Sequence, residues 1–324
     1  MARIFVTRRL PGPALDQLSQ RHEVEIWSNR LPPPYEELKQ HVQDADGLLS
    51  TLSDRIDAPL IDGATNLKAI ANYAVGYDNV DVDAATRRGI PVGNTPDVLT
   101  DATADLAFAL LLAAARRLPE ATATVRDGTW DTWDPTGLLG RSVYGKTLGI
   151  IGAGRIGQAV AKRATGFDME VLVAGRSGSD QDTTKQQPRQ QDGRTHILEL
   201  LQRSDFISIH CPLTEQTRDL IDTEALRLMK PTAILINTAR GPIVDQRALA
   251  TALRDGQIAG AALDVTDPEP LPADDPLLLA PNLIVAPHIG SATHEAREQM
   301  TQLSVDNLLA ALNGEAMPHP VNRP

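Results

Sequence analysis

The chain has 324 residues, which is enough for two domains of about 150 residues each. Its net charge of −11 argues against a nucleic-acid partner, because such partners call for a basic stripe. Its one cysteine, Cys211, excludes an intrachain disulfide framework and suits a reducing compartment, so we expect a cytoplasmic protein.

The apolar segments of the sequence indicate neither a membrane span nor an export signal. The chain enters a strand at Arg3–Thr7 with no signal-type apolar core before it. The most apolar segment, Thr103–Ala115, is too short to span a bilayer and contains Asp105. We expect it to be a helix buried on most sides, at a domain or subunit interface.

The first hundred residues alternate between apolar runs and polar, helix-like runs such as Tyr35–Val42 and Val82–Arg88. Repeated βα units of this kind predict a parallel, doubly wound sheet. The candidate strands are Arg3–Thr7, Val24–Trp27, Gly47–Thr51, Leu67–Ala71 and Pro91–Gly93.

A long apolar helix is predicted over Thr100–Leu118, with capping-type residues at Asp97–Asp101. The stretch Asp127–Gly145 then loses periodicity and contains Trp130 and Trp133. It has two interpretations: an arm packed on a partner, or a surface loop with the tryptophans tucked under it.

A second α/β set begins at Lys146. Its strands are nearly continuous apolar runs, as expected for strands covered on both faces. They are Thr147–Ile151, Glu170–Val173, Phe206–His210, Ala233–Asn237, Ala259–Asp264 and Leu283–Ala286. Gln181–Arg194 is predicted to be a polar loop, and Thr293–Leu312 a final helix before a proline-rich end.

The motif GAGRIG at Gly152–Gly157 lies between the strand TLGII and a helix that starts near Arg155. In this context its glycines allow a tight turn, the approach of a pyrophosphate and close helix packing, and the helix N-terminus attracts the anion. The motif therefore predicts a dinucleotide-binding loop; a tight turn without a ligand is the alternative.

The strand after this loop ends without the carboxylate that usually binds the adenosine ribose. Arg176 and Ser177 stand there instead, where they suit a 2′-phosphate. We therefore expect NADP(H) to be preferred over NAD(H). The alternative is that Arg176 is solvated and Asp180 folds back onto the ribose.

Three further side chains follow predicted strands, and the carboxyl ends of parallel strands face one crevice. Arg240 can hold a carboxylate in a bidentate fork, and His288 can exchange a proton with a carbonyl oxygen. Glu269, on a proline-flanked loop, can orient the imidazole and favour its charged form. The alternatives are a surface salt bridge, a structural histidine and a solvated loop acid.

Asp264 ends its strand inside the same crevice. We interpret it as lying near the nicotinamide or the arginine, with a capping or buried structural acid as the alternative. The whole set suits hydride transfer to the carbonyl of a small anionic acid, and no metal ion is expected.

The chain resembles the D-isomer-specific 2-hydroxyacid dehydrogenases over nearly its whole length. Within that family, the sequence around Asp264 and His288 is most similar to that of the glyoxylate/hydroxypyruvate reductase branch. The resemblance is carried by ANYAVGYDNVDVDAA (71–85), TADLAFALLL (103–112), GIIGAGRIGQAVAKR (149–163), NTARGPIVD (237–245), ALDVTDPEPLP (262–272) and PHIGSAT (287–293).

The resemblance implies a Rossmann cofactor domain, residues 100–288, inserted into a flavodoxin-like substrate domain, residues 1–99 plus 289–324. It also implies a homodimer formed through the cofactor domain. Gln246 replaces an acid often found in relatives, and we expect this change to have little effect.

Residue roles follow from the same resemblance. Arg240 would bind the substrate carboxylate and polarise its carbonyl, and Glu269 would pair with His288, the general acid/base. The backbone amides of Val75 and Gly76 would hold the carboxylate. The remaining residues implied at the substrate are Ser291 and, at the cofactor, Thr103, Gly152, Gly154, Arg155, Ile156, Gly157, Pro212, Thr217, Thr238, Asp264 and Gly290.

The expected reaction is the NADPH-dependent reduction of glyoxylate or hydroxypyruvate to the D-2-hydroxy acid. Another D-2-hydroxyacid specificity is the first alternative. The second is a cofactor-sensing binding protein of the corepressor type, although no peptide-binding segment stands out in the sequence.

Overall fold

The computed structural model describes residues 1–175 and 193–324, with side chains from residue 197 onward in the second range. The described chain forms two compact units. Unit 1 comprises Met1–Leu99 and Ser291–Pro324, and unit 2 comprises Thr100–Gly290. Across the described ranges, no helix is both long enough and apolar enough to cross a bilayer.

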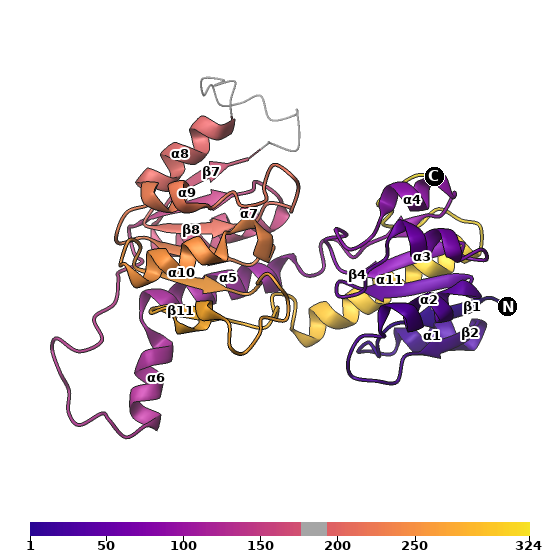
Figure 1. Ribbon diagram of the computed structural model, residues 1–324, viewed down its shortest axis with the longest axis horizontal. Coiled ribbons are helices and arrows are strands. Elements are labelled where there is room, and N and C mark those ends of the chain that lie inside the picture. The colour runs from indigo at the N-terminus through magenta and orange to yellow at the C-terminus, as the bar shows by residue number, and fades with distance from the viewer. Residues whose placement is uncertain (176–192) are drawn as a thin grey trace. The chain divides into compact units, whose positions relative to one another are not determined.

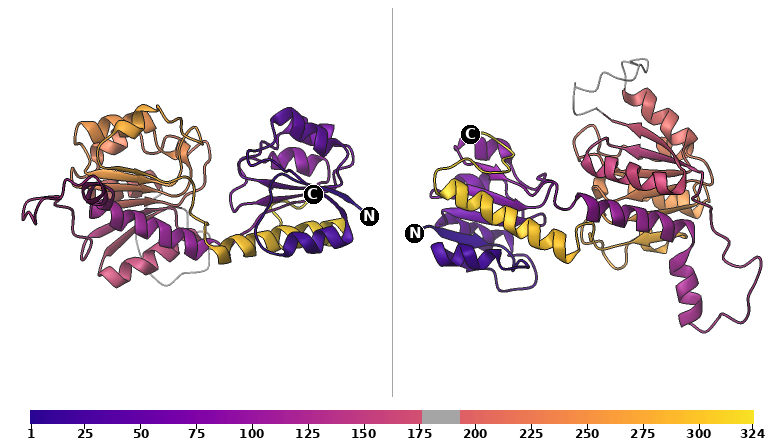
Figure 2. Two further views of the ribbon diagram at one scale, coloured as in Figure 1. Left: turned by 90° about the horizontal axis from the view of Figure 1, so that it is seen from below. Right: turned by 180° about the vertical axis from the view of Figure 1, so that it is seen from behind.

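Unit 1 is a parallel five-stranded sheet in the order β2-β1-β3-β4-β5 with helices on both faces (Figures 1 and 2). Helices α1 and α11 pack together on one face, and α2, α3 and α4 cover a hydrophobic core on the other. The strands are β1 (Arg3–Val6), β2 (Glu23–Ile26), β3 (Gly47–Thr51), β4 (Ala69–Tyr73) and β5 (Val92–Gly93). The helices are α1 (Ala14–Arg21), α2 (Tyr35–Gln43), α3 (Ala58–Gly63), α4 (Val82–Arg87) and α11 (His294–Leu312).

Unit 2 is a parallel six-stranded sheet in the order β11-β10-β9-β8-β6-β7. Helices α5 and α7 pack on one face, and α8, α9 and α10 on the other (Figure 1). The strands are β6 (Thr147–Ile151), β7 (Glu170–Ala174), β8 (Phe206–Ile209), β9 (Ile234–Asn237), β10 (Gly260–Leu263) and β11 (Leu283–Val285). The helices are α5 (Thr100–Ala115), α6 (Leu118–Arg126), α7 (Arg155–Ala164), α8 (Gly193–Arg203), α9 (Thr223–Leu228) and α10 (Gln246–Arg254), with the short 3-10 turns η1 (Thr165–Phe167), η2 (Gly241–Ile243) and η3 (Pro276–Leu279).

The predicted fold class, two doubly wound parallel sheets, is confirmed. The inner strands β6, β8, β9 and β10 are almost entirely buried, because helices cover both faces. Strand β6 pairs with β7 on one side and with β8 on the other, so the strand order reverses there. In open α/β sheets ligands bind beyond the carboxyl ends of the strands at such a reversal.

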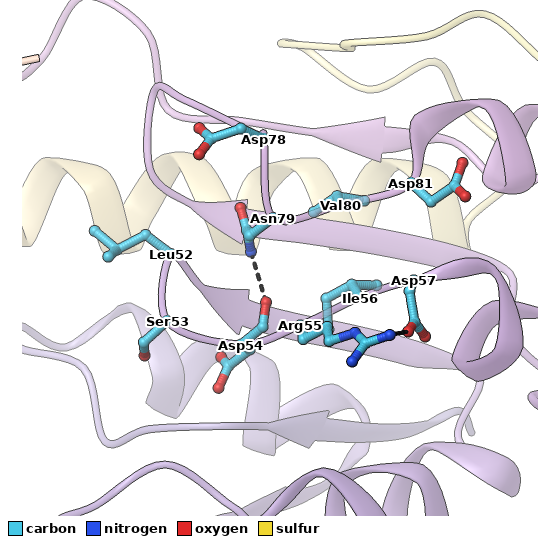
Figure 3. Close-up of a pocket in the computed structure, with 10 residues that line it drawn as sticks. All are labelled: Leu52, Ser53, Asp54, Arg55, Ile56, Asp57, Asp78, Asn79, Val80 and Asp81. Carbon is cyan, nitrogen blue, oxygen red and sulfur yellow. Dashed lines mark hydrogen bonds and ion pairs between the residues drawn. The ribbon is translucent and has the colours of Figure 1, made fainter. Parts of the chain in front are cut away.

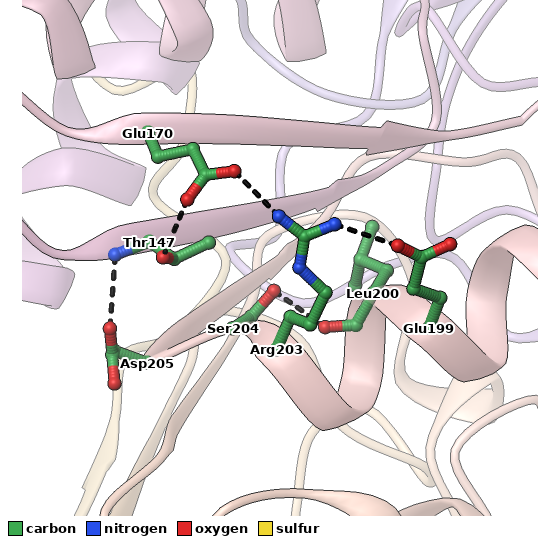
Figure 4. Close-up of polar contacts among 7 residues, drawn as sticks. All are labelled: Thr147, Glu170, Glu199, Leu200, Arg203, Ser204 and Asp205. Carbon is green, nitrogen blue, oxygen red and sulfur yellow. Dashed lines mark hydrogen bonds and ion pairs between the residues drawn. The ribbon is translucent and has the colours of Figure 1, made fainter.

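The opposite edge of this sheet, where the strands begin, carries exposed ion pairs (Figure 4). The Arg203 guanidinium lies 2.7 Å from a carboxylate oxygen of Glu170 and 2.7 Å from one of Glu199. Asp205 accepts a hydrogen bond of 3.0 Å from the Thr147 amide, and its other oxygen lies 2.9 Å from Nζ of Lys230. These contacts tie the starts of β6, β7 and β8 to α8.

The segment after α5 differs from the prediction. The apolar helix ends at Ala115, Arg117 adopts a left-handed conformation with φ 52°, and α6 begins at Leu118. Helix α6, which the sequence pattern did not predict, buries none of its residues in the chain. Trp130 and Trp133 are 65% and 78% exposed, so the interpretation that they are tucked under a loop is wrong.

Candidate active site

The loop Gly152–Gly157, here called the phosphate loop, lies at the carboxyl end of β6. Gly152 has φ 111°, and a Cβ there would lie 2.5 Å from the Cys211 amide nitrogen. A Cβ on Gly157 would lie 2.1 Å from the Gly152 carbonyl oxygen. Both positions therefore require glycine, for a tight turn and for close packing of α7.

Gly154 has a different environment. It is the N-cap of α7, its position has no heavy atom within 4 Å of a built Cβ, and no side chain caps the helix. The first turn of α7 thus presents backbone N–H groups to open space, which suits a pyrophosphate. The predicted residues Arg155 and Ile156 form this turn.

Other predicted cofactor residues lie after neighbouring strands. The Thr238 hydroxyl, just after β9, is buried and has no hydrogen-bond partner among the described residues, so it is available to a ligand. Thr217 donates a 2.7 Å hydrogen bond to the Pro212 carbonyl, which places both in one turn after β8. Arg176 and Ser177 lie outside the described residues.

The Arg240 turn packs directly on the loop that carries Glu269. A Cβ on Gly241 would lie 2.0 Å from the Thr266 carbonyl oxygen, so only glycine allows this approach. The Asn237 side chain closes the turn by donating a 2.8 Å hydrogen bond to the Arg240 carbonyl. One Arg240 guanidinium nitrogen donates to the Ala239 carbonyl at 2.8 Å.

Gln246 also contributes to this packing, which the sequence did not predict. Its amide oxygen accepts a 3.0 Å hydrogen bond from the Asp267 amide, and its amide nitrogen donates to the Asp267 carbonyl. A carboxylate could accept the first bond but could not donate the second. Glutamine at position 246 therefore supplies a donor, which an acid there would lack, and this donor holds the loop leading to Glu269.

His288 and Glu269 lie side by side. Nδ1 of His288 is 2.5 Å from Oε1 of Glu269, and the two side chains are 21% and 34% exposed. Within the described residues, Nε2 of His288 has no hydrogen-bond partner. The carboxylate thus fixes the ring through one nitrogen and leaves the other for a ligand.

Asp264 holds the loop that carries the imidazole. Its two carboxylate oxygens accept hydrogen bonds from the Ile289 and Gly290 amides at 2.8 Å and 2.7 Å, and its carbonyl accepts one from His288 at 2.9 Å. Asp264 is only 1% exposed, and burial raises the pKa of its carboxyl above the usual value.

These contacts of the Asp264 carboxylate with backbone amides are those of the structural alternative, and the place of Asp264 near the nicotinamide stays a prediction. Thr103 lies close by, because Gly290 packs against both residues. A Cβ on Gly290 would lie 3.2 Å from an Asp264 oxygen and 3.3 Å from the Thr103 side chain.

Sequence reasoning missed His210, which lies against the phosphate loop. The histidine follows β8, its carbonyl carbon would lie 2.5 Å from a Cβ on Gly152, and its Nε2 lies 2.8 Å from the Ser208 hydroxyl. Burial lowers the pKa of His210 to about 4 and raises that of Cys211 to about 11. The sequence did offer one signal for His210, namely a histidine at the end of a predicted strand.

In unit 1, Val75 and Gly76 form a turn after β4. The Asn94 side-chain amide donates to the Val75 carbonyl at 2.8 Å, and the Asn72 amide donates to the Gly76 carbonyl at 3.0 Å. Neither the Val75 nor the Gly76 amide N–H has an acceptor within the described ranges. Ser291 begins the second segment of unit 1, where its carbonyl accepts from Arg297 and Thr293.

A hollow of about 390 Å³ in unit 1 is lined by residues 52–57, after β3, and by residues 78–81, before α4 (Figure 3). Asn79, one of the lining residues, donates a hydrogen bond to the Asp54 carbonyl at 2.9 Å. The hollow is lined by four aspartates and one arginine, which makes it unsuitable for a carboxylate substrate. Its charged lining residues are Asp54, Arg55, Asp57, Asp78 and Asp81.

Comparisons with known proteins agree on one family. Residues 108–290 match the profile of the D-isomer specific 2-hydroxyacid dehydrogenase, NAD binding domain. The chain is 48% identical to a glyoxylate reductase of Korarchaeum cryptofilum, over 99% of this chain and 96% of that protein. It is 50% identical to a glyoxylate reductase of Thermococcus kodakarensis, again over 99% and 96%.

Solved structures give the same result. A crystal structure of a Thermus thermophilus protein superposes with a TM-score of 0.90 at 50% identity, covering 99% of this chain and 100% of that one. An NADPH-dependent glyoxylate/hydroxypyruvate reductase of Sinorhizobium meliloti, in complex with NADP and malonate, superposes with a TM-score of 0.85 at 34% identity, covering 99% and 97%.

Proposed function

Because the chain belongs to the D-isomer-specific 2-hydroxyacid dehydrogenase family, and is therefore an NAD(P)-dependent oxidoreductase, we propose that it reduces glyoxylate or hydroxypyruvate. NADPH is the preferred reductant, and the product is the D-2-hydroxy acid where it is chiral. The observation that carries this proposal is the 2.5 Å contact between His288 and Glu269 at the carboxyl edge of the unit 2 sheet. Names of the relatives support the substrate class.

The cofactor would be held by residues whose surroundings fit it. Gly154, Arg155 and Ile156 at the start of α7 would bind the pyrophosphate, and the unpartnered hydroxyl of Thr238 would face the same ligand. When bound, the reduced nicotinamide supplies the hydride. Thr103, Gly290, Pro212 and Thr217 would line the rest of this site.

His288 is the proton donor in this proposal. Nε2 of the imidazolium gives its proton to the substrate carbonyl oxygen as the carbonyl carbon is reduced. Glu269 orients the ring and stabilises its positive charge through Nδ1. Asp264 acts one step back, because it fixes the backbone of residues 288–290.

Each unit offers one group that suits the carboxylate of a 2-oxo acid. The Arg240 guanidinium can bind it in a bidentate fork and polarise the adjacent carbonyl. The Val75 and Gly76 amides, which have no acceptor among the described residues, can bind an anion as a backbone nest.

The preference for NADPH rests on the end of β7. The residues after Ala174 in the sequence are Gly175, Arg176 and Ser177, and none of them is a carboxylate. A 2′-phosphate would therefore meet a cation and a hydroxyl. A related structure described as NADPH-dependent contains NADP, which supports the same choice.

A substrate panel tests the function. Initial rates with glyoxylate, hydroxypyruvate, pyruvate and phosphohydroxypyruvate are measured with NADPH and with NADH. We expect glyoxylate or hydroxypyruvate with NADPH to give the highest kcat/KM. Equal or better use of NADH would contradict the role of Arg176, and no turnover with any 2-oxo acid would contradict the enzyme assignment.

The segment from α6 to residue 145 is the proposed homodimer arm. It exposes apolar side chains along its length, which fits burial against a second copy. Those exposed by 40% or more are Leu118, Val125, Trp130, Trp133, Leu138, Leu139 and Tyr144. Sedimentation equilibrium should give a dimer, and replacing both tryptophans by serine should weaken it; a wild-type monomer would contradict this proposal.

A further inference from the structure

The amides of Val75 and Gly76 can bind one anion only if their two N–H bonds point the same way. Nothing in their own side chains ensures this, since valine and glycine carry no polar group. The direction of each N–H is fixed instead by its peptide plane, in which the preceding carbonyl points the opposite way. Whatever holds the carbonyls of Ala74 and Val75 therefore aims the two N–H groups.

Both carbonyls are held by two consecutive residues. The Thr95 amide donates to the Ala74 carbonyl at 2.9 Å, and the Asn94 side-chain amide donates to the Val75 carbonyl at 2.8 Å. The first bond aims the Val75 N–H, and the second aims the Gly76 N–H. Asn72 then holds the next plane through the Gly76 carbonyl at 3.0 Å.

Asn94 is itself held from the C-terminal part of unit 1. Its carbonyl accepts a 3.0 Å hydrogen bond from Asn307 of α11, and its amide donates to the His319 carbonyl at 3.2 Å. Asn307 is fully buried and accepts from the His319 amide at 2.9 Å. A Cβ on Gly93 would lie 2.6 Å from the Asn307 side-chain nitrogen, so glycine is required for this contact.

We propose that Asn94 is a positioning residue for the substrate carboxylate: it aims the Gly76 N–H by holding the Val75 carbonyl, and Asn307 and His319 hold it in turn. This inference rests on the proposed function, because it takes the anion bound at this turn to be the carboxylate of a 2-oxo acid. Through Asn94, it links the C-terminal helix and tail to the substrate site.

The test separates substrate binding from cofactor binding. The variant Asn94→Ala removes the amide donor, and Asn94→Asp keeps the shape while replacing that donor with an acceptor and a negative charge. We expect KM for glyoxylate to rise about 10- to 100-fold, as for a lost hydrogen bond to a charged group, and more in Asn94→Asp than in Asn94→Ala. The Kd for NADPH and kcat at saturating glyoxylate should stay within about threefold of wild type, since the lost contact concerns ground-state binding.

Asn322→Ala is the matched control. Asn322 also joins the C-terminal tail to β5, through a 2.7 Å bond to the Val92 amide and a 3.0 Å bond to the Ile90 carbonyl, but it does not contact the turn. It should lower the unfolding temperature without raising KM for glyoxylate. An unchanged KM in both Asn94 variants, a parallel rise in KM and NADPH Kd, or an equal rise of KM in Asn322→Ala would each overturn the proposal.

Oxalate binding keeps the test independent of turnover. If wild type reduces no 2-oxo acid, the proposed function fails, and calorimetric titration of wild type and Asn94→Asp with oxalate still decides the role of Asn94. Weaker oxalate binding by the variant would support the positioning role. Equal binding, or no oxalate binding by wild type, would overturn it.

Discussion

The two edges of the unit 2 sheet are built from the same strands and yet hold their polar groups in opposite ways. At the edge where the strands begin, Arg203, Glu170 and Glu199 form ion pairs whose side chains are about half exposed (Figure 4). At the carboxyl edge, Asp264 is buried and accepts hydrogen bonds from two backbone amides, and Glu269 is fixed on His288 at 2.5 Å.

The difference between the two edges lies in how far their polar groups are buried. An exposed ion pair exchanges water for a partner at little net gain, so it stabilises the fold weakly. A buried polar group must be satisfied, and its geometry is therefore fixed by its partners. At the carboxyl edge, burial therefore fixes the positions of the polar groups. We expect substitutions there to lower the reaction rate more than they lower the free energy of unfolding.

The largest effect is expected for His288→Ala. Loss of the proton donor should lower kcat for glyoxylate reduction by about 10²- to 10⁴-fold. Binding of NADPH, followed by its fluorescence, should remain, because His288 does not hold the pyrophosphate. A variant with wild-type turnover would sink the assignment.

Asp264→Asn should have the next largest effect. An amide cannot accept from both the Ile289 and Gly290 N–H groups, so the loop carrying His288 loses one fixed contact. We expect kcat/KM for glyoxylate to fall about 10- to 100-fold. Asp168→Asn, at an exposed position, is the control. An equal loss of kcat/KM in that variant, or no loss in Asp264→Asn, would contradict the proposal that Asp264 holds the loop carrying His288.

A smaller effect, on stability rather than rate, is expected at His210. Its pKa is lowered from 6.5 to about 4 in the folded chain, so below pH 6.5 the unfolded state takes up a proton that the folded state does not. Its contribution to the free energy of unfolding is therefore present above pH 6.5 and lost as the pH falls towards 4. Urea unfolding at pH 7.5 and 4.5 should show wild type losing about 2 kcal/mol more than His210→Asn; an identical loss would contradict the buried neutral imidazole.

Arg203→Ala should have the smallest effect. Because its ion pairs are exposed, the free energy of unfolding should fall by less than about 1 kcal/mol, and less still in high salt. Glyoxylate turnover should not change. A loss of several kcal/mol would mean that the two edges do not differ as described.

Much of this architecture was predictable because it depends on local rules. Continuous apolar runs predicted all the strands of unit 2 described here to within one or two residues, and the GAGRIG motif predicted the start of α7 at Arg155. The order of Arg240, Glu269 and His288 after parallel strands indicated one edge of the sheet. Helix α6 was missed because it buries no residue in this chain, so its sequence has no marked apolar face to indicate a helix.

The supporting contacts could not be predicted, since they join residues far apart in sequence. Gln246 was expected to matter little, and its two hydrogen bonds to Asp267 depend on how η2 packs on the loop after β10. The pairing of Asn94 with Asn307 likewise requires the C-terminal helix to be in place. Side-chain amides carry no pattern that reveals such partners.

The most direct test of the central claim, that His288 and Glu269 act as one proton-transferring unit, is a double-mutant cycle. The kcat for NADPH-dependent glyoxylate reduction is measured for wild type, Glu269→Gln, His288→Ala and the double variant. If Glu269 acts only through the imidazole, the double variant should be within about threefold of His288→Ala. Losses that multiply in the double variant would show that the two residues act independently and would contradict the account.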